Sequence, residues 1–353
     1  MKFEVLSLKN KKEWSDLLSK LSIDQQDIYF TPEYYELYEN NGDGKAQCFV
    51  FEDNDDIALY PFLINSVNKL GYDLDDEYFD IQGAYGYNGV VTTSNEKNFI
   101  KKFYLSFDEY CKNENIIAEF TRFHPLINNS VFSEEFLQIV PDRKTIYIDL
   151  QKTYEELFSK FQTTTRKQIK RAIYRHKIEV KWYEKDVTQL NIFLDIYNET
   201  MDRVNSIPYL YFNKQYFKSL IETTNNVCFE AIYQGKPIAA ILVFYNQTYL
   251  HGHLGGALTE YLSMSPYSLL YSEIIKFGQM KGCKYFHIGG GATTNINDPL
   301  LQYKLHFSQT TLDFYIGKKI HNQKIYDEVV KQWEIKFPEK KEKYNNLLLK
   351  YRY

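Results

Sequence analysis

Two pairs of apolar runs, one pair in each half of the chain, dominate the pattern of hydrophobic and polar positions. In the first half, residues 48–52 (CFVFE) and 57–64 (IALYPFLI) are separated by a short polar segment. In the second half, residues 227–233 (VCFEAIY) and 238–245 (IAAILVFY) are separated by QGKP. Because β-rich runs joined by a short polar turn are typical of a β-hairpin, the pattern predicts one hairpin in each half.

The same order of elements follows each hairpin. A segment rich in glycine or tyrosine comes first, then a helix, then another strand. In the first half these segments are residues 83–89, 98–114 and 116–123, and in the second half 252–257, 266–281 and 285–288. Pro266 suits a first helical position with Ser265 as its cap, and Gly282 suits the end of that helix. The repeated order predicts a duplicated fold.

Between the halves, the pattern predicts a strand at residues 145–150 and helices at 153–161, 165–176 and 189–204. Because 353 residues exceed the usual size of one core, two domains are expected. We predict a mixed α+β chain with domains at 1–143 and 144–321, followed by a helical extension at 322–353. Sustained heptads are absent from the sequence, so no coiled-coil insertion is expected.

Composition narrows the class of protein. Apolar residues make up 44% and charged residues 25% of the chain, and the net charge of −4 does not favour DNA binding. The four cysteines are widely spaced, so reduced thiols are expected rather than a metal site or disulfides. The first residues lack a signal-peptide core, and no run approaches ~20 apolar residues. We expect a cytoplasmic protein, with at most transient contact with the inner membrane face.

The order and spacing of several segments resemble the Fem-type aminoacyltransferases and the FemAB-like branch of the GNAT acyltransferases. These segments are YGYNG at 85–89, RKQIKRA at 166–172, residues 191–203, 235–240 and 262–271, and residues 289–307 with Lys304 in LLQYKLHF. The resemblance implies two tandem GNAT-like domains. It also implies acyl or aminoacyl transfer to an amine of an envelope precursor, such as a peptidoglycan-type peptide, a nucleotide-linked amino sugar or a lipid-linked precursor.

Two departures from the family leave the acyl donor open. The coiled coil that grips tRNA in many bridge-forming members is missing. The R-x-x-G-x-G/A loop, which holds the pyrophosphate of acyl-CoA in ordinary GNAT enzymes, is missing as well. The donor is therefore aminoacyl-tRNA, bound through its acceptor end, or acyl-CoA, and no tightly bound cofactor is expected. Two alternatives to envelope-peptide chemistry are an acyl-CoA-dependent N-acyltransferase of surface polysaccharide synthesis and a non-catalytic binding protein.

Acyl transfer to an amine requires a positioned amine and a stabilised oxyanion, but no covalent nucleophile. By its place in the family pattern, Lys304 is the candidate for stabilising the oxyanion, and the neighbouring Tyr303 is a candidate substrate-binding residue. Residues 301–307 are predicted to form a strand. The alternative for Lys304 is an ordinary solvated surface lysine.

Basic residues gather on the helix predicted at 165–176. Arg166 and Lys170 lie four residues apart on one stripe, and Arg171 lies on a neighbouring stripe. Because guanidinium groups bind phosphate through paired hydrogen bonds, this helix is a candidate site for a phosphate-bearing ligand. The alternative is a solvated helix face.

Other candidates have weaker support. Tyr85 and Tyr87 could stack on a sugar or base beside Asp80, which could accept a proton from the attacking ammonium; the alternative for Asp80 is an acidic loop residue. Arg122 ends the last strand of the first half and is a candidate substrate-binding residue. His253 is a candidate for an acyl pocket. His251 and His253 lack a third ligand in the sequence, so no metal site is predicted.

Overall fold

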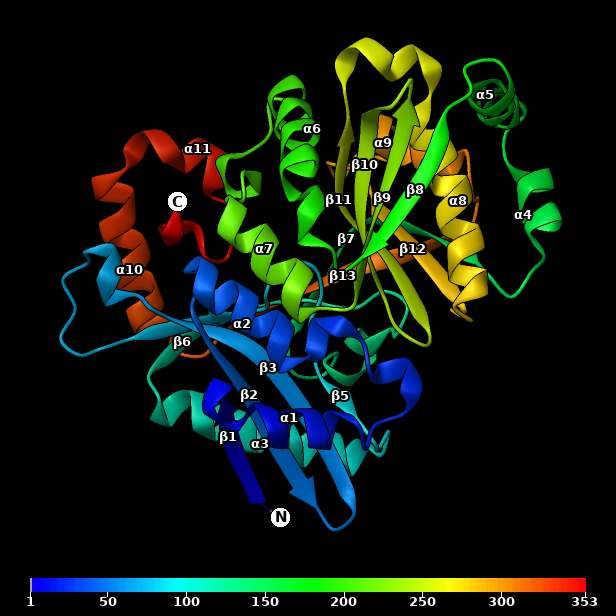
Figure 1. The fold of residues 1–353 in the computed structure, drawn as a ribbon. Coiled ribbons are helices and arrows are strands. Elements are labelled where there is room, and N and C mark those ends of the chain that lie inside the picture. Colours follow the sequence, from blue (N-terminus) through cyan, green and yellow to red (C-terminus); the bar gives the residue numbers. More distant parts are fainter. Residues whose placement is uncertain (1) are drawn as a thin grey trace. The chain divides into compact units, whose positions relative to one another are not determined.

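The computed structural model describes residues 2–353 and divides into two compact units (Figure 1). The first unit contains the chain up to Asp142 together with Phe314–Tyr353, and the second contains Arg143–Asp313. Each unit is described by itself. The domain limits of 1–143, 144–321 and 322–353 stay a prediction.

The first unit is built on a sheet in the order β1-β2-β3-β4-β6-β13, with the short β5 paired to β3. Neighbours along this order are antiparallel except β4 and β6, which are parallel. The strands are β1 (Lys2–Ser7), β2 (Lys45–Asp53), β3 (Asp56–Ser66), β4 (Phe79–Gln82), β5 (Val91–Thr92), β6 (Ile116–Arg122) and β13 (Thr311–Ile320). The hairpin predicted in this half is β2–β3, with Asp53 opposite Asp56 at its turn.

Aromatic packing holds this sheet between helices. Phe49 and Phe51 of β2 lie on the face that packs against Phe103 and Phe107 of α3. Side chains alternate between the two faces of a strand, so the residues of β2 next to Phe49 and Phe51 point to the other face of the sheet. Helix α2 covers that face. The helices of this unit are α1 (Lys11–Leu18), α2 (Pro32–Asn41), α3 (Lys97–Asn113), α10 (Gln323–Lys336) and α11 (Lys341–Tyr344).

The C-terminal segment completes the first unit. Strand β13 pairs with β6 through Ile316–Ile320, and α10 then packs on a second apolar cluster that contains Ile117 and the fully buried Trp333. The indole of Trp333 donates a hydrogen bond to the carbonyl of Tyr353 over 3.1 Å. The helical character predicted for the tail is therefore confirmed at Gln323–Lys336.

The second unit is built on a sheet in the order β7-β12-β11-β10-β9-β8. Only β11 and β12 are parallel among its neighbouring pairs. The strands are β7 (Gln138–Asp149), β8 (Glu179–Glu184), β9 (Asn226–Tyr233), β10 (Lys236–Tyr245), β11 (Tyr249–Ala257) and β12 (Tyr285–Gly290). The predicted hairpin is β9–β10, so each unit has the hairpin that the sequence indicated. Each unit also has one parallel strand pair.

Helices cover both faces of the second sheet. In Figure 1, α6 lies on one side of strands β9 to β11, and α5 and α8 lie on the other. The helices are α4 (Tyr154–Lys160), α5 (Thr163–Tyr174), α6 (Leu190–Arg203), α7 (Lys214–Thr223), α8 (Pro266–Met280) and α9 (Pro299–Leu305). Thr153 and Glu156 form the capping box at the start of α4. Ser265 is the N-cap residue of α8 and Pro266 its first residue, as predicted, but Ser265 adopts a left-handed backbone with φ of 56° and its side chain makes no cap hydrogen bond.

Across residues 2–353, helices that combine enough length with enough apolar character to cross a membrane are absent.

Candidate functional site

A cavity of about 570 Å³ lies within the second unit. Its wall combines the second half of β11, the end of α6, the start of α8 and three residues of α9. Among the lining residues are Thr200, Met201, Arg203, Gly252, His253, Gly255, Gly256, Tyr267, Ser268, Tyr271, Tyr303 and Lys304. A cavity of this size is within the range of small-ligand sites.

The cavity begins where strands β11 and β12 part. Their parallel pairing runs from Tyr249 opposite Tyr285 to His251 opposite His287, whereas β11 continues to pair with β10 as far as Ala257. Because backbone groups along a strand point alternately to its two sides, those of Gly252–Ala257 that turn away from β10 face this gap. The parting of two parallel strands therefore supplies main-chain hydrogen-bonding groups to the cavity wall.

Two glycines of β11 allow close contacts at this wall. A Cβ atom on Gly255 would lie 2.7 Å from the Tyr267 hydroxyl, and one on Gly256 would lie 2.2 Å from the Thr200 hydroxyl. Thr200 in turn accepts a hydrogen bond from the backbone N–H of Ala257 over 3.0 Å. Larger residues at these positions would push α6 and α8 away from the strand.

Lys304 lies in the cavity wall on α9, so the predicted strand at 301–307 is wrong. Asp298 accepts hydrogen bonds from the backbone N–H groups of Leu300 and Leu301, and Pro299 occupies the first helical position. Both residues are standard start signals for a helix, and the sequence displays them. The short apolar run was interpreted as a strand because a helix of only seven residues is too short to show its period clearly.

The ammonium of Lys304 is held inside the protein. Its Nζ donates to the carbonyl oxygen of Gly290 over 2.7 Å, and the residue is 9% exposed, so the alternative of a solvated surface lysine is wrong. Burial lowers the pKa of Lys304 to about 8; Asp298 opposes this shift and Arg143 adds to it. At neutral pH the side chain is mostly a cation, and it loses its proton far more easily than an ordinary lysine does.

The glycine triplet at 289–291 ends strand β12 and receives this ammonium. Gly289 has φ of 74°, a conformation that favours glycine, and a Cβ there would lie 3.2 Å from the Lys304 Nζ. The guanidinium of Arg143 donates to the carbonyls of Gly291 and Ala292 over 3.0 and 3.1 Å. The end of β12 is thus held by Arg143 and by Lys304.

Neutral hydroxyl groups line the cavity beside Lys304. The Tyr303 hydroxyl lies 3.0 Å from the Ser268 hydroxyl, and burial raises the pKa of Tyr303 to about 12. Burial also raises the pKa values of Tyr267 and Tyr271. These three phenols keep their protons at neutral pH and can donate hydrogen bonds or, for a strongly basic leaving group, a proton.

His253 occupies a β-bulge that sets it into the cavity wall. Leu242 of β10 lies opposite Leu254, but the next residue, Val243, lies opposite Gly252, so His253 is the extra residue. Its ring lies 4.3 Å from that of Phe244, and its Nε2 lies 3.4 Å from the Tyr216 hydroxyl. Desolvation, together with the nearby His251, lowers the pKa of His253 to about 3, so the ring is neutral at physiological pH.

The comparisons with known proteins match this geometry. Residues 159–305 match the family model described as an acetyltransferase (GNAT) domain. Most of the second unit therefore matches a GNAT domain. The match covers the parting strands, the start of α8 and Lys304, and it supports the prediction that the chain is an acyltransferase. Comparison with curated protein sequences gives no match.

Solved structures share the fold of the whole chain. The crystal structure of FemX has a TM-score of 0.68 at 12% identity and covers 93% of this chain and 99% of its own. The structure of L-PGS from Bacillus licheniformis has a TM-score of 0.57 at 11% identity, covering 90% of this chain and 94% of its own. A tandem GNAT protein from the clavulanic acid biosynthesis pathway has a TM-score of 0.50 at 6% identity, covering 90% of this chain and 98% of its own. The predicted twin GNAT-like fold is thereby confirmed, and the chain shares its fold with FemX.

The residue that the basic helix α5 contributes to the cavity wall is not one of those predicted. Gln168 lines the cavity of the GNAT domain, whereas Lys170 and Arg171 are exposed and lie outside the lining. The guanidinium of Arg166 donates to the carbonyls of Ser159 and Phe161, which ties α5 to the end of α4. The structure therefore brings none of the three predicted phosphate-binding residues into the cavity wall.

Asp80 is an ion-paired residue of the first unit. It lies on β4, is fully buried, and accepts a hydrogen bond from the Arg352 Nε over 2.8 Å. Both earlier interpretations of Asp80 need correction: it is no loop residue, and its carboxylate is already engaged by a guanidinium. Burial raises the pKa of Asp80 while Arg352 lowers it. We do not retain Asp80 as the acceptor of a proton from the substrate.

The other candidates of the first unit sit among aromatic rings. The carbonyl of Tyr85 accepts a hydrogen bond from the Tyr34 hydroxyl, and the ring of Tyr87 packs at 5.1 Å from that of Tyr29. The guanidinium of Arg122 lies over the ring of Phe120 at 5.0 Å. Their predicted roles in substrate binding stay a prediction.

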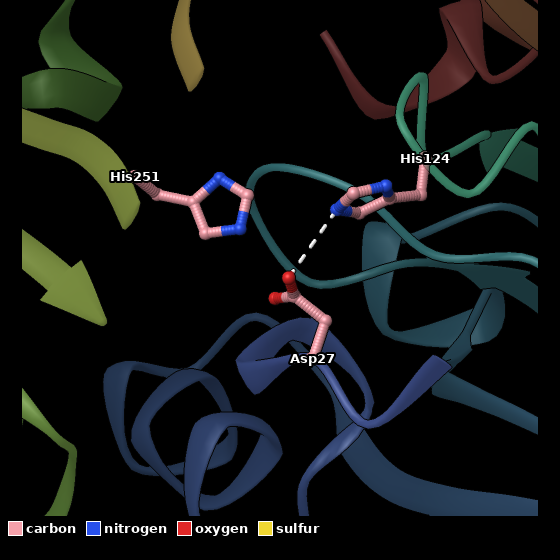
Figure 2. Close-up of side chains that lie close together, drawn as sticks. All are labelled: Asp27, His124 and His251. Carbon is pink, nitrogen blue, oxygen red and sulfur yellow. Dashed lines mark ion pairs between the residues drawn. The ribbon is translucent and has the colours of Figure 1, made fainter. Parts of the chain in front are cut away.

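Sequence reasoning missed a buried pair in the first unit. Figure 2 shows the carboxylate of Asp27 turned toward the ring of His124, with Oδ2 and Nε2 3.5 Å apart and both side chains fully buried. Asp27 also accepts from the backbone N–H of Tyr29, at the start of a single helical turn. The two residues come from distant segments, and their sequence contexts carry no signal that pairs them.

Proposed function

We propose that this protein transfers an acyl or aminoacyl group to an amino group of a cell-envelope precursor, and that the reaction takes place in the cavity of its GNAT domain. The observation that carries the proposal is the Lys304 ammonium, which is buried in the wall where β11 and β12 part. A cation in a low-dielectric cavity interacts strongly with developing negative charge, because water does not screen it.

The proposed step needs no covalent intermediate. The nitrogen of a neutral amine attacks the carbonyl carbon of an ester or thioester, a C–N bond forms, and negative charge moves to the carbonyl oxygen. The C–O or C–S bond then breaks, the amide nitrogen loses a proton to solvent, and the leaving group takes one up. Lys304 stabilises the oxyanion, and the neutral Tyr303 phenol donates a hydrogen bond to the leaving group, which takes its proton from solvent.

Acyl-CoA is the donor that we propose first, with aminoacyl-tRNA as the alternative. The residues Ser265–Ser268 at the start of α8 line the cavity, and the N-terminal end of a helix favours an anionic group such as a pyrophosphate. The exposed cations Lys170 and Arg171 lie outside the lining, so a basic path for tRNA into this cavity lacks its expected residues. The family model, which describes an acetyltransferase domain, agrees with CoA.

An envelope precursor is the acceptor that we propose, on the likeness to FemX and to L-PGS. The candidates are a peptidoglycan-type peptide, a nucleotide-linked amino sugar and a lipid-linked precursor, met in the cytoplasm or at the inner membrane face. An amine acceptor fits the reaction, because the attacking atom must be a neutral nucleophile that does not depend on activation by a strong base.

A transfer assay tests the proposal. Purified protein is incubated with acetyl-CoA or with alanyl-tRNA and with a panel of acceptors that contains a pentapeptide precursor and a UDP-linked amino sugar, and products are followed by mass spectrometry. We expect a mass increase of one acyl group on one acceptor, and its loss in Lys304→Met. Donor binding without transfer to any acceptor would favour the non-catalytic alternative, and transfer from alanyl-tRNA alone would overturn the choice of CoA.

A further inference from the structure

The wall of the GNAT cavity is apolar and aromatic over most of its extent. Side chains from four different elements meet there: Met201 from α6, Ile241 from β10, Leu254 from β11 and Ile288 from β12. The tyrosines at 267, 271 and 303 add ring surface. Such a wall gains free energy from covering hydrocarbon, about 25 cal/mol for each Å² of apolar surface removed from water.

The charges around the cavity are of one sign. Among the described residues that line it, the ionised side chains are Lys304 and Arg203, and none is an aspartate or glutamate. Lys304 is bonded to the carbonyl of Gly290, and Arg203 donates to the carbonyl of Ala257 over 2.8 Å. His253 and the tyrosines are neutral, because desolvation lowers the pKa of the first and burial raises those of the others. A cationic group in this cavity would lie near Lys304, and the described lining offers it no carboxylate to offset the repulsion; Asp298, which interacts with Lys304, lies outside the lining.

The apolar wall continues to the surface. Val204, Leu262 and Leu300 line the cavity and are also exposed, at 58%, 43% and 43% respectively. Three exposed aliphatic residues from three separate elements at one opening form an apolar patch that a bound chain would cover. The space of about 570 Å³ corresponds to the liquid volume of roughly twenty water molecules, far more than an acetyl group fills.

We propose that this cavity accepts an uncharged, largely apolar acyl group of several carbons, and that it rejects acyl groups with a cationic side chain, such as lysyl. The inference rests on the proposed function for its placement of the acyl group. Its physical content is selectivity by charge: hydrocarbon is covered by the wall, whereas an ammonium would lose its water and gain no anion in return. Lys304 acts on the carbonyl end and the apolar wall on the chain.

Binding of three matched primary amides tests the selectivity without requiring catalysis. Hexanamide is neutral, 6-aminohexanamide is cationic and adipamic acid is anionic, and all three have the same chain length. Affinities are measured with the full chain by ligand-observed NMR. We expect hexanamide to bind at least about tenfold more tightly than 6-aminohexanamide, a difference of about 1.4 kcal/mol. Equal or tighter binding of the cationic amide, or failure of all three to bind, would overturn the proposal.

A matched pair of methionine variants places the selectivity in this cavity. Met201 is half-buried in the wall, whereas Met280 is 63% exposed at the last position of α8. Met201→Glu is expected to bring the two affinities within about threefold of each other by giving the ammonium a counter-charge, whereas Met280→Glu leaves the ratio unchanged. The same effect from both variants would contradict the assignment. If hexanamide binds as expected but no donor supports transfer, the proposed function fails and the binding selectivity stands.

Discussion

The first unit buries the carboxylate of Asp80 and the second buries the ammonium of Lys304, but the two charges have different surroundings. Asp80 meets a guanidinium that binds it through two nitrogens. Lys304 meets a main-chain carbonyl and lies in the wall of a cavity. An ion pair such as Asp80 with Arg352 links two segments of chain, and the two charges cancel. A charge that is hydrogen-bonded only to a neutral carbonyl, as in Lys304, is not cancelled and can still attract an anionic group of a ligand.

The parallel strand pairs of the two sheets also differ between the units. Both units have a hairpin and one parallel strand pair, but the parallel pair of the first unit, β4 with β6, stays paired as far as Gln82 opposite Phe120, at the end of β4. The parallel pair of the second unit ends at His251 and His287, while β11 runs on to Ala257. In the first unit the parallel strands β4 and β6 stay paired to the end of β4. In the second unit the parallel strands β11 and β12 separate, and the cavity lies where they do.

The largest expected effect is on the stability of the first unit. Asp80→Asn leaves the Arg352 guanidinium buried without an anion, so we expect a loss of about 3 kcal/mol or more of unfolding free energy. Urea unfolding followed by tryptophan fluorescence, to which the buried Trp14 and Trp333 of the first unit contribute, would measure it. Adding Arg352→Met should recover part of the loss, since the second change removes the unpaired charge. A loss below about 1 kcal/mol, the range of an exposed ion pair, would contradict the structural role.

Lys304→Met should have the opposite pattern of effects, with a loss of activity and no loss of stability. We expect turnover to fall at least about tenfold, as when an oxyanion contact is removed, while the second unit keeps or gains stability because an apolar chain replaces a desolvated charge. Steady-state kinetics and thermal unfolding on the same preparation would separate the two effects. Lys218→Met, at an exposed lysine of α7, is the matched control and should alter neither. A loss of turnover accompanied by unfolding would assign Lys304 to the core instead.

The pH dependence of turnover should report the state of Lys304. Burial lowers the pKa of Lys304 from its ordinary value of 10.5 to about 8. Because the protonated form is the one that stabilises an oxyanion, turnover should fall as the pH rises through about 8, once the opposing ionisation of the acceptor amine is corrected for. A rise through the same pH, lost in Lys304→Met, would make Lys304 a base.

The same pKa has a consequence for stability. Between pH 8 and 10.5 the unfolded chain binds a proton at Lys304 that the folded chain has released. Unfolding then takes up protons, so the contribution of this group to stability rises with pH across that window. The difference between wild type and Lys304→Met in thermal unfolding should therefore shrink from pH 7 to pH 10.

The smallest effect is expected on α5. Lys170→Glu and Arg171→Glu change exposed charges outside the cavity lining, so the KM for acetyl-CoA should change by less than about threefold, because salt screens exposed charges. Steady-state kinetics at low and physiological salt would measure it. A tenfold or larger rise, weakened by salt, would revive the helix as a binding site for a phosphate-bearing donor.

Periodicity predicted the elements well where they are long. The hairpins at 48–64 and 227–245 and the helices α3, α6 and α8 have many residues in register with their period, so their apolar faces could be read directly. The element predicted wrongly is short. Helix α9 is seven residues long, and its cap at Asp298 was overlooked. Ser265 precedes α8 as expected but adopts a left-handed backbone, which its sequence context does not reveal.

The candidate site was harder to predict than the fold. Lys304, Tyr303 and His253 do line one cavity, but Lys304 and His253 were singled out by family position and by histidine spacing. Arg166, Lys170 and Arg171 attracted attention through charge density, although one of them holds carbonyls of a neighbouring helix and the others are solvated. Charge along a sequence says little about which charges are buried, because burial depends on segments that pack from elsewhere.

By itself, the sequence determined the repeated order of hairpin, strand, helix and strand, because local hydrophobic periodicity and turn chemistry act over a few residues. It also displayed the glycines at 252, 255 and 256 and the proline that starts α8. Only the tertiary structure decided that β11 and β12 part after His251, that Lys304 is buried against Gly290, and that Asp80 is neutralised by Arg352. The physical reason is that a strand's parting and a charge's surroundings are set by contacts between segments far apart in the chain.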